Sequence, residues 1–141
     1  MTSGELQNLA RIGSLKAEPP DRAEFLRLLA SGRTRLRDAK NADLALESQF
    51  DLAYNAAHAL CLAALRWHGY RAANRYVVFQ AVQHTIGLPA PAVRVLARSH
   101  QIRNATEYQG QAPVTATLVN DLLAAASLLE AAVADLDPPK R

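Results

Sequence analysis

The sequence has little of what disulfide scaffolds, metal centres and membrane spans are built from. Its 141 residues contain one cysteine, Cys61, so an oxidised, secreted scaffold is not expected. Its histidines and carboxylates lack metal-ligand spacing, and we expect no metal and no cofactor. No apolar run approaches the roughly 20 residues of a membrane span, and the N-terminus lacks a signal-peptide core. The expected location is therefore cytoplasmic, with no membrane partner.

Aromatic residues are also scarce. They make up 6% of the chain, whereas half of all residues are apolar, so the core must be built from Leu, Ala and Val. Such a composition is typical of helical bundles. A chain of this length forms one domain, so we expect a single domain over residues 1–141.

Helical periodicity begins at the N-terminus and continues through the first half of the chain. Apolar residues three apart predict a short helix within residues 3–16. Asp21 and Glu24 form a capping-box pattern at the start of a second helix. The longest helix is predicted from about residue 43 to 68, and Gly69 should end it in the left-handed conformation. Small alanines on its buried face should let a neighbouring helix approach closely.

Residues 74–86 allow two interpretations. The run from Tyr76 to Phe79 would suit a strand, whereas the apolar positions spaced by four favour a helix. A lone strand among helices would have no pairing partner. The sequence therefore predicts a helix here, ended by Gly87 and Pro89.

The second half of the chain completes the bundle. Helices are predicted over 91–108 and 114–136, joined by a turn at 110–113. The proline-containing tail, 137–141, is expected to fray. The fold class that follows is all-α: an up-and-down bundle of four to five helices over residues 21–136.

Acidic residues are absent from the middle of the chain. Between Leu52 and Thr106 there is no Asp or Glu, but there are six arginines and all four histidines. Thirteen of the sixteen basic residues are arginine, whose planar guanidinium suits bidentate binding of phosphate or carboxylate. Two interpretations stay open: this segment binds an anion, or it forms a solvated basic surface that aids solubility.

A polar cluster closes this segment. His100, Arg103 and Glu107 share one helix face with Asn104 and Tyr108 beside them, and the same stripe is apolar one turn earlier. Arg103 can neutralise a phosphate, Asn104 can orient an oxygen, and His100 can act as an acid or base near neutral pH. The alternative is structural, with Arg103 and Glu107 forming a helix ion pair and Tyr108 packing against the following turn.

Two segments resemble the HEPN-domain family. The segment from Phe50 to Leu60, continuing to Gly69-Tyr70-Arg71, resembles the family's long second bundle helix and its glycine-ended turn. The segment from Arg103 to Tyr108 resembles its late Arg-Asn signature. The resemblance covers roughly residues 20–135 and implies a small helical bundle of the kind associated with nucleotidyltransferases, toxin–antitoxin systems and RNA cleavage.

The resemblance also implies a site and a departure from the family pattern. Ribonuclease members place Arg, a polar residue and a downstream His from two protomers at a dimer interface, which cleaves RNA without metal. Here Arg103 and Asn104 match, but Tyr108 stands at the histidine position and His100 precedes the motif. A tyrosine with a pKa of about 10 is a poor base at neutral pH, although it can stack on a nucleobase.

Three functions compete on these observations. The first is a nucleic-acid- or nucleotide-binding module, non-catalytic or weakly catalytic, in a toxin–antitoxin or defence system. The second is a metal-independent ribonuclease toxin acting at a dimer interface. The third is an accessory subunit of a nucleotidyltransferase. Expected partners are a second copy of the chain, RNA or a nucleotide, and an antitoxin or nucleotidyltransferase. In the first case the surrounding positive field would come from Arg66, Arg71, Arg75, Arg94 and Arg98.

Overall fold

The computed structural model describes residues 3–109 and 114–141, and the side chains of these residues except those of 3 and 106–109. The turn predicted at 110–113 lies outside the described residues. In chain order the elements are α1 (Ser3–Arg11), β1 (Leu15–Ala17), α2 (Arg22–Ala39), α3 (Leu46–Trp67), β2 (Tyr70–Ala72), α4 (Arg75–Ala81), the 3-10 helix η1 (Val82–His84), α5 (Ala90–Gln109) and α6 (Ala116–Ala134).

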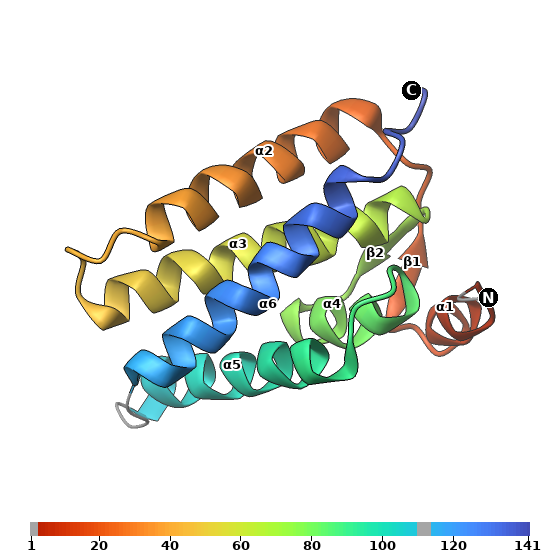
Figure 1. Cartoon of the computed structure of the whole chain (residues 1–141). Coiled ribbons are helices and arrows are strands. Elements are labelled where there is room, and N and C mark those ends of the chain that lie inside the picture. The colour runs from red at the N-terminus through yellow and green to blue at the C-terminus, as the bar shows by residue number, and fades with distance from the viewer. Residues whose placement is uncertain (1–2, 110–113) are drawn as a thin grey trace.

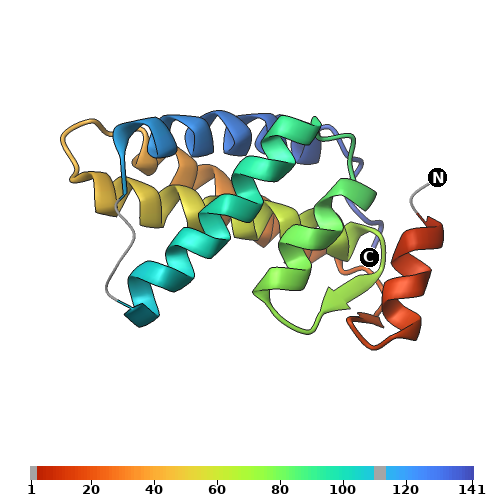
Figure 2. The ribbon, with the colours of Figure 1, turned by 90° about the horizontal axis from the view of Figure 1, so that it is seen from below.

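The four long helices α2, α3, α5 and α6 form a bundle in which successive long helices run in opposite directions (Figure 1). The predicted all-α helical bundle is confirmed. α3 lies at its centre with α2 and α6 packed along it, and α5 crosses α3 obliquely when the molecule is seen from below (Figure 2). The short helix α4 connects the end of α3 to α5 and contacts both.

Small residues on α2 and α3 explain how closely these two helices approach. The alanines at positions 53, 57 and 64 are fully buried, as their periodicity predicts. Gly32 of α2 lies against Leu60 of α3, and a Cβ atom added at residue 32 would stand 2.5 Å from the Leu60 Cγ. A glycine that weakens an isolated helix is therefore required here by packing.

The helix boundaries follow the capping signals in the sequence. The Asp21 side chain accepts a hydrogen bond from the Glu24 N–H at 3.0 Å, but the Glu24 carboxylate turns toward arginines instead of completing the box. Asn74 caps α4 by accepting from the Val77 N–H at 3.0 Å. Gly69 follows α3 with φ of 87°, as predicted for a left-handed C-cap.

The N-terminal segment differs from its prediction. The first helix ends at Arg11, whereas its end was predicted near Gly13 or Lys16, and Gly13 follows it with φ of 86°. Residues Leu15–Ala17 then pair antiparallel with Tyr70–Ala72 as a two-stranded sheet. Strands of three residues are too short to leave a periodic signal, and the pairing joins segments more than 50 residues apart. The sheet fixes α1 against the end of the bundle.

The C-terminal tail is docked, in place of the fraying predicted for 137–141. Trp67 Nε1 donates a hydrogen bond to the carbonyl of Asp137 at 2.6 Å. Arg22 Nη1 donates to the carbonyl of Pro139 at 3.2 Å. Because these partners lie on α3 and α2, the tail covers the end of the bundle where those helices end and begin.

The expectation that no apolar run approaches membrane-spanning length is wrong for helix α6. By length and composition alone it would qualify, with a mean hydropathy of 1.5. Its apolar residues Leu118, Leu122 and Leu129 are buried in the bundle core, however. A core helix passes the same test because burial demands the same composition. The cytoplasmic location stays a prediction.

Candidate functional site

The six arginines of the acid-free segment occupy three separate places. Arg66 of α3 and Arg71 of β2 lie close together, Arg94 and Arg98 line a groove between α5 and α6, and Arg75 and Arg103 contact the ring of Tyr54. The segment is therefore not one basic face, and each pair needs its own explanation.

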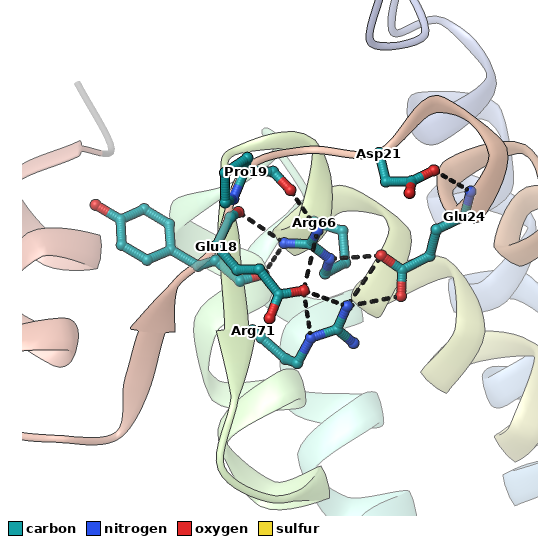
Figure 3. A network of polar contacts seen from close by, with 7 residues as sticks. Glu18, Pro19, Asp21, Glu24, Arg66 and Arg71 are labelled. Carbon is teal, nitrogen blue, oxygen red and sulfur yellow. Dashed lines mark hydrogen bonds and ion pairs between the residues drawn. The ribbon is translucent and has the colours of Figure 1, made fainter. Parts of the chain in front are cut away.

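Arg66 and Arg71 belong to an ion-pair network that joins α2, α3 and the sheet (Figure 3). Arg66 is only 1% exposed; its Nε donates to Glu24 at 2.7 Å, and its Nη atoms donate to the carbonyls of Glu18 and Pro19 at 2.9 and 2.7 Å. Arg71 donates to both carboxylates. These two arginines serve the fold, contrary to the expectation that they add to a field around a ligand.

The carboxylates of this network are held in their charged form. A hydrogen bond from Arg71 lowers the pKa of Glu18 below its ordinary value. Burial raises the pKa of Glu24, but hydrogen bonds from Arg66 and Arg71 outweigh that effect, so its pKa is also lowered. Each carboxylate therefore stays ionised at neutral pH and keeps its guanidinium partners in place.

Four of the predicted site residues lie near Tyr54 of α3: Arg75, His100, Arg103 and Asn104. Tyr54 is 1% exposed, and its hydroxyl lies 2.9 Å from Nδ1 of His100 on α5. Nε2 of the same imidazole lies 3.3 Å from Nδ2 of Asn104. Both ring nitrogens therefore have partners, and the Tyr54 hydroxyl fixes the orientation of the ring. His100, Arg103 and Asn104 thus lie in one region of α5, and their role as a site stays a prediction.

Two guanidinium groups converge on the Tyr54 ring from different helices. The Arg103 Cζ lies 4.7 Å from the ring centroid and the Arg75 Cζ lies 5.7 Å from it, both within cation–π range. Asp51 stands at the edge of this cluster: its Oδ1 is 4.0 Å from Arg103 Nε, and its side chain is 65% exposed. A pair so long and so solvated neutralises little of the cluster's charge.

Burial and this positive charge together lower the pKa values of two histidines. Burial, followed by the charges of Arg75, His100 and Arg103, lowers the pKa of His58 to about 4. Burial, followed by Arg75 and Arg103, also lowers the pKa of His100. Both imidazoles are neutral at pH 7, and the positive charge of the cluster resides on the two arginines.

The lowered pKa of His58 has a measurable consequence for stability. The native imidazole stays neutral down to about pH 4, whereas the unfolded chain takes up this proton near pH 6.5. Stability should therefore fall as the pH drops through this window, by up to about 1.4 kcal/mol per pH unit. Urea denaturation at several pH values measures the slope. A His58→Asn variant should flatten it, and an unchanged slope in that variant would contradict the assignment.

Two predicted residues are not placed by the structure. The side chains of Glu107 and Tyr108 lie outside the described residues, so the predicted Arg103–Glu107 ion pair and the role of Tyr108 stay predictions. Among the residues that the structure does describe, no group of three or more His, Cys, Asp or Glu side chains is arranged to hold a metal ion.

Tyr54, Asn55 and Phe79 were missed as members of the site. Asn55 Oδ1 accepts a hydrogen bond from Arg75 Nη1 at 3.3 Å, and the Phe79 ring lies 5.7 Å from that of His100. The spacing of Tyr54 and His58 by one helical turn was the available signal. It could not show which face of α3 meets α5, because that depends on how the helices pack.

Arg94 and Arg98 lie on the opposite side of α5. Nine residues separate Arg94 from Arg103, which is about half a turn around an α-helix after two full turns. They line a groove of about 680 Å³ with Thr117 and Asp121 of α6. They are therefore not part of the cluster around Tyr54.

Comparison with protein-family models, with curated proteins and with solved structures gives no match. The described residues form a helical bundle with a small two-stranded sheet. Because these comparisons give no match, the chemistry of the site is the basis for inferring the function.

Proposed function

We propose that this chain is a HEPN-like module that binds RNA or a nucleotide through phosphate, at the cluster formed by Arg75, Arg103 and Asn104. The observation that carries the proposal is the convergence of two guanidinium groups from α4 and α5 on one buried ring. The Asp51 carboxylate lies 4.0 Å from Arg103 Nε and is largely solvated. Guanidinium groups bind phosphate well because their N–H donors match its oxygens in charge and geometry.

Each side chain has a distinct role in this proposal. Arg75, which is exposed, meets an approaching phosphate first, while Arg103 is anchored over Tyr54 with its side chain 23% exposed. The exposed Asn104 amide offers an orienting hydrogen bond. The His100 imidazole is neutral, so it adds no positive charge to the cluster. A toxin–antitoxin or defence system, with a second copy of the chain as partner, remains the proposed context.

A ribonuclease activity is a second candidate because one observation favours it. His100 combines a lowered pKa with a position one turn before Arg103, so an unprotonated imidazole stands near the proposed phosphate site. In metal-independent cleavage such a base removes the 2′-hydroxyl proton, the oxygen attacks phosphorus, and the 5′-oxygen leaves. Nδ1 contacts Tyr54 and Nε2 faces Asn104, so Asn104 must move for His100 to act.

Binding of fluorescent single-stranded RNA, measured across about 50 to 200 mM salt, tests the primary proposal. Affinity should fall steeply as salt rises, because phosphate contacts release counterions. A parallel incubation with chelator tests cleavage in the wild type and in Tyr108→His, which restores the histidine of the family pattern. If the wild type binds no RNA or nucleotide at low salt, the proposal is wrong and the accessory-subunit interpretation replaces it.

A further inference from the structure

A pocket between α4 and α5 lies next to the phosphate cluster. It has a volume of about 240 Å³, below the roughly 300 to 1,000 Å³ of pockets for drug-sized ligands. A single planar ring system would suit it better. His100 lines this pocket while contacting Tyr54 and Asn104 on the cluster side, so the pocket and the cluster share one side chain.

The walls of the pocket are aromatic and uncharged. Phe79 and His100 form one side, with ring centroids 5.7 Å apart, and Tyr76 stands at the mouth 6.1 Å from the His100 ring. Among the described residues that line it, none is Asp, Glu, Lys or Arg. A neutral aromatic pocket beside two cations matches a ligand with a neutral ring attached to an anion.

The rim of the pocket carries glutamine side chains that can form hydrogen bonds with a heterocycle. Gln80, Gln83 and Gln101 line the pocket, and each is exposed at the surface. Their amides offer both donors and acceptors, which suit the polar edge of a nucleobase. Tyr76 is 60% exposed, so its ring is open to a stacking partner, and it directly follows Arg75 of the phosphate cluster.

We infer that this pocket holds an unpaired nucleobase, stacked on Tyr76, while the attached phosphate is bound by Arg75 and Arg103. This inference rests on the proposed function and extends it from phosphate binding to recognition of one base. The ligand is a free nucleotide or a single-stranded RNA residue; a base inside a duplex is paired and stacked and cannot enter the pocket.

Calorimetric titration with AMP, ribose 5-phosphate and inorganic phosphate separates the base from the anion. AMP should bind about tenfold or more tightly than ribose 5-phosphate, and Tyr76→Ala should remove most of that advantage. Tyr76→Phe should retain it, because stacking needs only the ring. The control is Leu128→Ala, which shortens an exposed apolar side chain on α6, away from the pocket. It should leave the affinities for AMP and for ribose 5-phosphate unchanged.

The two proposals fail in different ways. Equal affinity for AMP and ribose 5-phosphate, with no effect of Tyr76→Ala, would overturn the base pocket and leave phosphate binding intact. Absence of binding to all three probes and to RNA would overturn both. A single-stranded oligoadenylate that binds more tightly than AMP, and loses affinity in Tyr76→Ala, identifies RNA as the source of the base. No such gain over AMP identifies the free nucleotide.

Discussion

The Arg66→Met variant should unfold more readily than the wild type by about 3 to 5 kcal/mol, which lowers the melting temperature by roughly 10 °C or more. The substitution leaves the carbonyls of Glu18, Pro19 and Tyr70 without a donor and removes the closest partner of Glu24. Buried charge pairs cost most when only one member is removed. Urea denaturation followed by circular dichroism measures the change.

A second arginine provides the control for this experiment. Arg33 pairs with Glu130 at 2.9 Å, but its side chain is 53% exposed. Arg33→Met should therefore change stability by less than about 1 kcal/mol, as expected for surface ion pairs. If both variants lose the same stability, Arg66 is no more than a surface cation and the network does not hold the sheet to the bundle.

The Arg103→Gln variant should bind single-stranded RNA about 10 to 100 times more weakly than the wild type. Glutamine keeps a polar side chain, though a shorter one, and removes the charge beside the phosphate. Losing one phosphate contact should also reduce the slope of log affinity against log salt by about 0.7. Fluorescence anisotropy at several salt concentrations yields both quantities.

Arg94 is the matched control on the same helix. Arg94→Gln removes an identical charge from α5, nine residues away and on the opposite side, in the groove facing α6. It should leave the affinity nearly unchanged. If Arg94→Gln weakens binding as much as Arg103→Gln does, the protein attracts RNA by its overall charge, and the cluster around Tyr54 is not a specific site.

Local signals predicted the helices well because each helix records its own burial and its own ends. The buried residues of α2 and α3 recur at helical spacing, and Asp21 and Gly69 mark boundaries that the structure reproduces. The choice of helix for residues 74–86 was correct for α4 and η1, since a strand there had no partner. These features depend on neighbours within a few residues.

The β1–β2 pairing and the ion pairs of Arg66 and Arg71 could not be predicted from local signals, because their partners lie far apart in the sequence. The whole of α2 and α3 separates β1 from β2 along the chain, and strands of three residues carry no recognisable period. Arg66 and Arg71 looked like part of a basic field because their partners, Glu18 and Glu24, precede them by more than 40 residues. A charge count along the chain cannot show which charges are neutralised in space.

The sequence by itself determined a helical bundle and drew attention to His100, Arg103 and Asn104, because helical spacing places these residues close together on α5. Only the tertiary structure decided which arginines surround them. Packing brought Arg75 of α4 to the Tyr54 ring beside Arg103, withdrew Arg66 and Arg71 into ion pairs, and turned Arg94 and Arg98 toward α6. Electrostatic interactions depend on distance through space and on burial, and neither can be determined from the order of the residues alone.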